Sequence, residues 1–222
     1  MRKALVVAID GPSGAGKGTV ARTVAARLSY HHVDTGAMYR AVAWKAKHDG
    51  VDLLDGEAVA NVAAKSRILV NARVLIDDHD VTEAIRTSDI DGAAAIVARH
   101  PAVRAVLVDR QRRYGVEGGV VMEGRDIGSV VFPAADVKIY LDASPDERAR
   151  RRAADAAHAA SRERTTSGVA EALEARDHSD RTRTTSPLKL AEDAVYIDTT
   201  GLPIGDVVDR VMALVTAAAE DR

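Results

Sequence analysis

The sequence contains no cysteine and few aromatic residues: one Trp, one Phe and five Tyr among 222 residues. Without cysteine the chain has no disulfide, no thiolate nucleophile and no thiolate metal site. The aromatic residues are too dispersed for a platform that stacks single-stranded bases, so we assign Trp44, Tyr114 and Phe132 to core packing. The formal net charge is only −2, which excludes a global field that would attract nucleic acid or an anionic membrane.

Long apolar runs are also missing. The run at Ala4 to Ile9 stops at Asp10, too early for a secretory signal or a membrane span. We therefore interpret it as a buried strand and expect a soluble, cytoplasmic protein. The seven histidines lack the paired spacing of metal ligands, so we predict no protein-borne metal site.

Short apolar runs alternate with helical patterns along most of the chain. They lack polar alternation, which is typical of strands covered on both faces of a parallel sheet. The five predicted strands are Ala4–Ile9, Tyr30–Val33, Gly119–Met122, Val137–Leu141 and Ala194–Ile197. Helical spacing follows Lys17, recurs in Met38–Lys47 and closes the chain at Ile204–Val215. This order predicts one doubly wound α/β domain.

One stretch departs from this alternation. Two apolar runs within Arg67–Val81 are divided by Asn71 and Ala72, which predicts a β-hairpin with a short third strand. The helical pattern of Gly92–Tyr114 that follows is expected to break near Pro101. The hairpin therefore marks a small antiparallel insertion.

A phosphate-binding loop is predicted directly after the first strand. Gly11, Gly16 and Lys17 have the spacing of a P-loop, between a strand and a helix. Its backbone N–H groups and the helix N-terminus would cradle the ATP phosphates. The predicted phosphate-binding residues are Gly11, Pro12, Ser13, Gly14, Ala15, Gly16, Lys17, Gly18 and Thr19. The alternative is a glycine-rich turn without a ligand.

Four further blocks accompany the loop in a fixed order: Asp34–Arg40 (DTGAMYR), Glu123–Gly128 (EGRDIG), Lys138–Ala143 (KIYLDA) and Arg176–Arg183 (RDHSDRTR). With the hairpin insertion, they resemble the bacterial cytidylate kinases from Val6 to about Asp198. The Gly18-Thr19 order after the lysine also resembles adenylate-kinase-like monophosphate kinases. The resemblance implies a P-loop nucleoside-monophosphate-kinase fold, with a five-stranded parallel sheet and helices on both faces.

The resemblance also implies the activity: in-line transfer of the ATP γ-phosphoryl group to CMP or dCMP, with Mg²⁺ carried by the donor and no covalent intermediate. The implied partners are these small molecules, without nucleic acid or membrane, and the chain is expected to be a monomer. Its 222 residues would comprise a core (about 1–34, 115–145 and 166–222), an acceptor-binding subdomain (about 35–114) and a lid (about 146–165).

Site residues follow from the same resemblance. The implied CMP-binding residues are Thr35, Tyr39, Arg40, Arg104, Arg125, Asp126, Arg176, Asp180 and Arg183. The implied catalytic residues are Lys17, Arg125, Arg176, Arg148 and Arg152. Arginine suits a second phosphate site because its planar fork grips two oxygens at once.

The base-reading assignment has a chemical basis. Cytosine presents an amine at N4 beside ring acceptors. The Asp126 carboxylate can accept from the amine, and the Arg104 guanidinium can donate to the ring acceptors. Asp126 could instead cap the loop after the third strand. Family members commonly carry a serine for the cytosine amine where this chain has Ala95, so a looser preference for cytosine is expected.

The sequence also allows other functions. The basic run within residues 146–152 could bind nucleic acid or a membrane, although a lid over the donor phosphates suits it better. The acceptor could be UMP, AMP or a non-nucleotide such as shikimate. The chain could also be a nucleotide-dependent switch that hydrolyses ATP slowly, but a switch does not require a second set of arginines.

Overall fold

The central sheet has five parallel strands. In a computed structural model of the chain, residues 4–154 and 166–220 are described, and the strand order is β2-β6-β1-β7-β8. The strands are β1 (Val6–Asp10), β2 (His31–Asp34), β6 (Val120–Gly124), β7 (Val137–Asp142) and β8 (Val195–Asp198). The predicted sheet, with all five of its strands, is confirmed.

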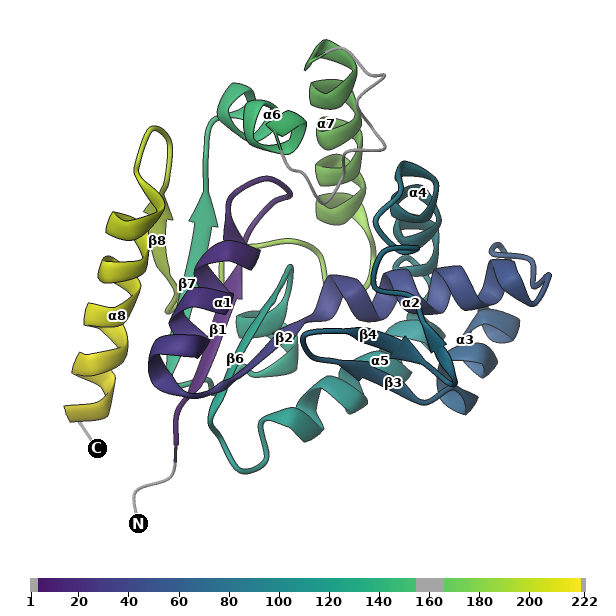
Figure 1. The fold of residues 1–222 in the computed structure, drawn as a ribbon, viewed down its shortest axis with the longest axis horizontal. Coiled ribbons are helices and arrows are strands. Elements are labelled where there is room, and N and C mark those ends of the chain that lie inside the picture. The colour runs from purple at the N-terminus through teal and green to yellow at the C-terminus, as the bar shows by residue number, and fades with distance from the viewer. Residues whose placement is uncertain (1–3, 155–165, 221–222) are drawn as a thin grey trace.

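Helices cover both faces of this sheet (Figure 1). The helices are α1 (Lys17–Leu28), α2 (Thr35–His48), α3 (Gly56–Lys65), α4 (Ser88–Val97), α5 (Pro101–Tyr114), α6 (Pro145–Ala154), α7 (Thr166–Thr182) and α8 (Ile204–Glu220), with a π-helical turn η1 (Ile127–Val131). Successive side chains of β1 face opposite sides of the sheet. Val7 and Ile9 pack with α1 and α8, whereas Ala8 packs with α5 and η1.

The insertion forms a second, antiparallel sheet of β3 (Ile68–Val70), β4 (Val74–Ile76) and β5 (His79–Asp80), which confirms the predicted hairpin and third strand. The break near Pro101 is also confirmed. His100 is extended ahead of the proline, so the predicted helical stretch is divided into α4 and α5.

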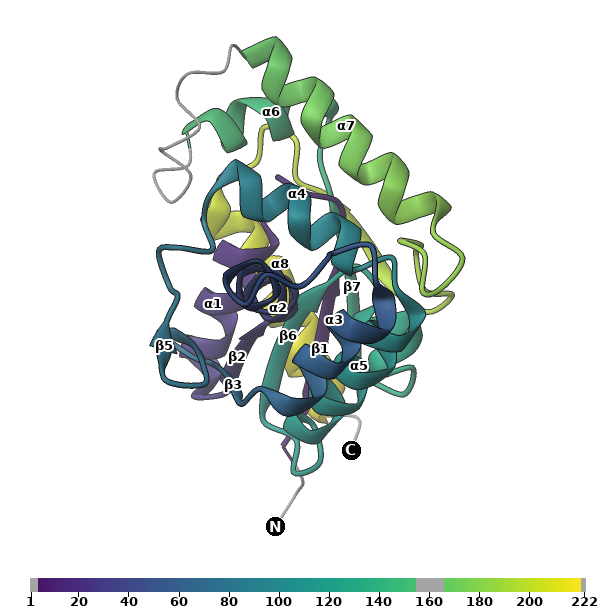
Figure 2. The same cartoon turned by 90° about the vertical axis from the view of Figure 1, so that its right-hand side faces the viewer.

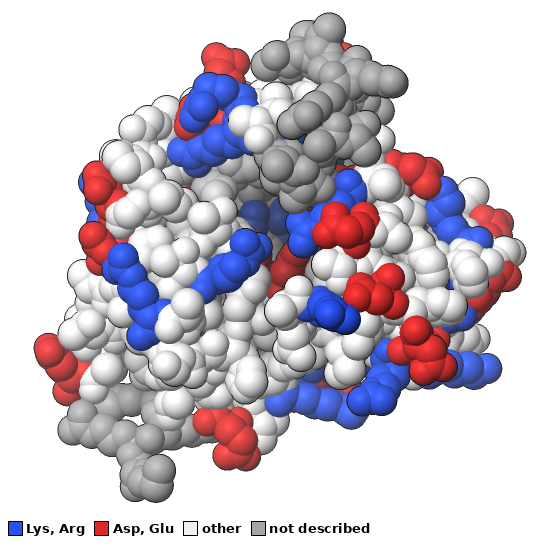
Figure 3. Space-filling model, viewed as in Figure 1, with Lys and Arg blue, Asp and Glu red and all other residues white. Residues whose placement is uncertain are grey.

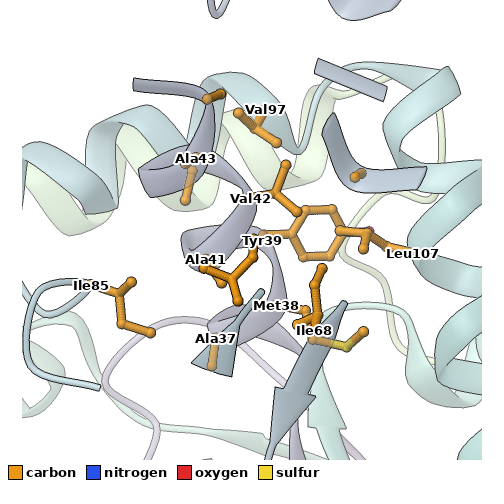
Figure 4. Packing of buried hydrophobic residues seen from close by; sticks show 14 of the residues in the cluster. Ala37, Met38, Tyr39, Ala41, Val42, Ala43, Ile68, Ile85, Val97 and Leu107 are labelled. Atoms are coloured by element: carbon orange, nitrogen blue, oxygen red, sulfur yellow. The ribbon is translucent and has the colours of Figure 1, made fainter. Parts of the chain in front are cut away.

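A separate hydrophobic cluster holds the inserted region together. It draws on α2, α3, α4, α5 and the small sheet, within residues 37–107. Figure 4 shows Tyr39 and Val42 of α2 packed toward Leu107 of α5. Because α2 follows directly from β2, this cluster fixes the inserted region beside the carboxyl end of the central sheet.

The described residues stop short of the complete predicted lid. Residues 146–154 belong to α6, which packs on α7 through Ala149, Val169 and Leu173. The remainder of the predicted lid, 155–165, lies outside the described residues. Within 4–154 and 166–220, no helix has the length and apolar character needed to span a bilayer.

Candidate active site

The glycine-rich loop after β1 has the backbone of a phosphate cradle. Gly11, Gly14 and Gly16 have φ angles of 144°, 80° and 91°, which favour glycine. A Cβ atom on Gly11 would lie 1.9 Å from the carbonyl oxygen of Leu141, so only glycine fits there. The loop ends at the N-terminus of α1, where free N–H groups favour an anion.

Lys17 is held inside this loop. Its ammonium group is buried and donates to the carbonyl oxygen of Pro12 at 2.7 Å. Burial lowers its pKa to about 7, and the positive charge of Arg125 acts in the same direction. An anion in the cradle would favour the charged form, so the lysine is prepared for a phosphate ligand.

Asp10 supports the loop from below. Its carboxylate accepts hydrogen bonds from the backbone N–H groups of Ile127 and Gly128, at 2.8 and 2.7 Å. Burial raises its pKa to about 6, against the opposing effect of these two bonds. Since both oxygens are engaged, Asp10 ties β1 to the turn after β6.

Two of the predicted acceptor-side arginines are paired with carboxylates. Arg40 donates to Asp34 at 2.8 Å, and Asp34 also caps α2 by accepting from the N–H of Ala37. Arg125 donates to Asp180 at 2.9 Å, and this ion pair is mostly buried. The guanidinium groups are thus held in place before any ligand binds.

Arg152 of α6 and Arg176 of α7 share a third carboxylate, that of Asp91 on α4. The distance from Arg176 Nη1 to Asp91 Oδ1 is 3.3 Å. Nothing in the sequence pattern singled out Asp91. Its role emerges only because three elements distant in the sequence meet here.

The predicted base-reading residues form a buried group beside the cleft. Arg104 donates to Asp126, and its guanidinium carbon lies 5.5 Å from the centre of the Tyr39 ring. Arg183 lies 3.8 Å from Asp126 and 3.3 Å from Asp180. Asp126 does not cap η1 with its side chain, so the loop-cap alternative has no support.

Thr35 and Glu123 lie between the two groups. The Thr35 hydroxyl donates to the carbonyl oxygen of Glu123 at 2.7 Å. The Glu123 carboxylate pairs with His32 at 3.2 Å and lies so near the loop that a Cβ atom on Gly18 would come within 3.1 Å of it. The sequence placed Glu123 in a motif but did not predict that its side chain faces the phosphate loop.

Arg148, a predicted contact of the transferring group, is anchored within the protein. Its side chain is buried and donates to the carbonyl oxygens of Ala143 and Ser13, each at 3.1 Å, and to Asp177. These partners turn its guanidinium group toward the back of the loop. Arg151, which no sequence pattern singled out, donates to Thr199 beside the loop.

The loop and the arginines face one cleft of about 650 Å³. Its lining includes loop residues 13–19 together with Arg40, Arg125, Arg152 and Arg176. Figure 3 looks onto this face, where basic side chains surround a central hollow in which acidic atoms are also visible. A second cavity of about 360 Å³ lies between α4 and α7 and is lined by Ala95, Arg152 and Arg176 among others.

A phosphate loop at the carboxyl end of a central parallel strand, opposite a second set of guanidinium groups, defines the class of P-loop phosphotransferases. A sequence model of the cytidylate kinase family matches residues 7–217. The chain therefore belongs to the cytidylate kinase family.

Two curated relatives agree with this assignment. A cytidylate kinase from Desulfitobacterium hafniense (strain Y51) is 47% identical over 218 residues, which cover 96% of this chain and 94% of the relative. A cytidylate kinase from Bacillus subtilis (strain 168) is 44% identical over 227 residues, which cover 97% and 98%. A solved gluconokinase from Sinorhizobium meliloti 1021 shares the fold, with a TM-score of 0.51 at 14% identity and coverage of 100% and 97%.

Proposed function

We propose that this chain transfers the γ-phosphoryl group of ATP to CMP or dCMP, giving ADP and CDP or dCDP. The observation that carries the proposal is the presence of two separate cationic groups in one cleft. Lys17 and the loop suit the donor phosphates, and Arg40, Arg125 and Arg176 suit the acceptor phosphate. Two polyanions held in this way approach each other in line, which is most of what phosphoryl transfer requires of a protein.

The acceptor oxygen needs no general base in this scheme, because a phosphate oxygen is already largely ionised at neutral pH. The γ-phosphorus bond to the bridging oxygen breaks as the CMP oxygen bonds to phosphorus, and ADP leaves with the bridging oxygen. Arg152, which lines the cleft, is proposed to meet the transferring group. For Arg148 we propose support of the loop instead, because its bonds go to carbonyl groups behind it.

Base recognition is assigned to the buried group. Asp126 would accept from the cytosine amine at N4, and Arg104 would face the ring acceptors. Asp180 is assigned to the ribose hydroxyls, and Arg183, which lies near Asp126 and Asp180, is assigned to the base and the phosphate. Thr35 and Tyr39, both buried on the first two turns of α2, are assigned to the same CMP site.

Mg²⁺ is proposed to enter with ATP. The described residues contain no cluster of three or more His, Asp or Glu side chains that could hold a metal ion. A Mg²⁺ ion bound to phosphate oxygens and water needs only one or two protein oxygens, and Thr19 and Glu123 both line the cleft. The ion would neutralise charge on the transferring group.

All of these residues come from one chain, so a monomer is sufficient for the proposed reaction. We also propose the division into core, acceptor-binding subdomain and lid. Its support is the separate hydrophobic cluster within residues 37–107.

A coupled assay of ADP release tests the function directly, with CMP, dCMP, UMP, AMP, shikimate or no acceptor. CMP and dCMP are expected to give the highest kcat/KM. Rapid turnover with AMP but not with CMP would contradict the assignment of Asp126. ATP consumption that a protein or nucleic acid stimulates, and CMP does not, would favour a molecular switch.

Binding of MgATP should take up a proton. Burial lowers the pKa of Lys17 to about 7 in the free protein, so part of the lysine is uncharged above neutral pH, and bound phosphates would favour the charged form. Calorimetry in two buffers of different ionisation enthalpy should show a larger proton uptake at pH 8 than at pH 6. Equal uptake at both pH values would show that the pKa of Lys17 is not lowered in the free protein.

A further inference from the structure

Asp91 joins three elements around the proposed phosphate site. It lies in the first turn of α4 and pairs with Arg152 of α6 and Arg176 of α7. Its side chain is only 15% exposed. Figure 2 shows α4 lying below α6 and beside α7, which is why one carboxylate reaches both guanidinium groups.

Arg152 and Arg176 lie between the phosphate cleft and the second cavity. Arg152 and Arg176 line both the phosphate cleft and the cavity between α4 and α7, whereas Asp91 lines the cavity between the helices. The carboxylate therefore approaches these guanidinium groups from the side of α4. Any phosphate in the cleft would have to share them with Asp91.

Electrostatics explains why a carboxylate is placed there. Burial lowers the pKa of Arg176, the positive charges of Arg125 and Arg40 lower it further, and the negative charges of Asp91 and Asp180 oppose them. Before substrates bind, Asp91 thus supplies negative charge that a phosphate would otherwise supply. When a phosphate arrives, it competes with Asp91 for the same donors and is repelled by its charge.

We infer that Asp91 competes with the substrate phosphates for Arg152 and Arg176, and so restrains transfer of the γ-phosphoryl group to water while no acceptor is bound. In that side reaction a water oxygen bonds to the γ-phosphorus, the bond to the bridging oxygen breaks, and a proton goes to the solvent. Transfer to water is restrained because Arg152 remains paired with Asp91 until an acceptor phosphate binds. That phosphate, with a charge of about −2, then competes with Asp91 and releases Arg152 from the ion pair.

The inference rests on the proposed function and is tested with Asp91→Asn. The matched control is Asp89→Asn, because Asp89 lies in the same first turn and pairs with a cation, Lys47, but is 68% exposed. Both variants lose one carboxylate that favours the helix N-terminus. ADP release is measured with saturating ATP, first without an acceptor and then over a range of CMP concentrations.

Asp91→Asn is expected to raise ATP hydrolysis without acceptor by about three- to tenfold, and to lower the KM for CMP by a similar factor. Asp89→Asn should leave both within about twofold of the wild type. Asp91→Glu, which keeps the charge, should restore low hydrolysis. Melting temperatures of the two Asn variants show whether a difference comes from folding.

A higher KM for CMP in Asp91→Asn, with unchanged hydrolysis, would overturn the inference and show that Asp91 only positions the guanidinium groups. Equal behaviour of Asp91→Asn and Asp89→Asn would overturn it as well. The wild type separates this failure from that of the proposed function, because CMP must stimulate ADP release in the wild type if the function is right.

Discussion

Replacing Lys17 by alanine is expected to lower kcat by about 100- to 1000-fold with every acceptor, as when one preorganised donor to the developing charge is removed. Lys17 is the cation inside the loop, and its ammonium group is fixed by the carbonyl oxygen of Pro12. The loss should be independent of the acceptor because Lys17 acts on the donor. Steady-state kinetics with CMP, dCMP and UMP measures it.

Binding of CMP provides the internal control for Lys17→Ala. The acceptor-side arginines are held by their own carboxylates, so the dissociation constant for CMP should change by less than about threefold. Lys47→Ala, which removes a partly exposed lysine from α2, should leave kcat near that of the wild type. A loss confined to CMP would show that Lys17 acts on the acceptor and would refute its assignment.

The second large effect is expected for Asp126→Asn. An asparagine amide can donate to the O4 atom of uracil, whereas the Asp126 carboxylate faces an amine donor only in cytosine. The ratio of kcat/KM for CMP to that for UMP should therefore fall by at least about tenfold. This change lies in the lower half of the range of discrimination expected from one base contact. The KM for ATP should change much less.

The same variant should also be less stable. Asp126 is buried with Arg104 and Arg183, and breaking such a pair leaves buried positive charge uncompensated. The expected loss is about 3 to 5 kcal/mol of the free energy of unfolding. Denaturant unfolding measures it, with the exposed Asp109→Asn on α5 as the control. An unchanged CMP to UMP ratio in folded Asp126→Asn would show that the base is read elsewhere.

Local patterns predicted the framework of this protein. Continuous apolar runs predicted β1, β6 and β7, because a strand buried on both faces leaves that mark in its own residues. The edge strands β2 and β8 are more exposed and were predicted from shorter β-rich runs between helical segments. The Pro101 break and the hairpin were predicted from their local backbone restrictions. The glycine spacing before Lys17 predicted the loop, since only glycine tolerates its positive φ angles.

The hydrogen-bond partners of Arg148 could not be predicted from local sequence. Its place in a basic run suggested contact with phosphate, and no local pattern indicated its partners Ser13 and Asp177, which lie 135 and 29 residues away. A charge run indicates a basic helix face without indicating which arginines the packing will bury. Arg152, two residues short of the helix end, remains in the cleft.

The amino-acid sequence determined the strands, the phosphate loop and the family, because each of these is written in neighbouring residues or in their order. Tertiary structure alone decided the charge partners. Arg125 meets Asp180 across 55 residues, and Arg176 meets Asp91 across 85. Such ion pairs form where the carboxyl ends of the strands meet the inserted helices. They cannot be predicted from a local sequence pattern, because each depends on how elements distant in the sequence pack together.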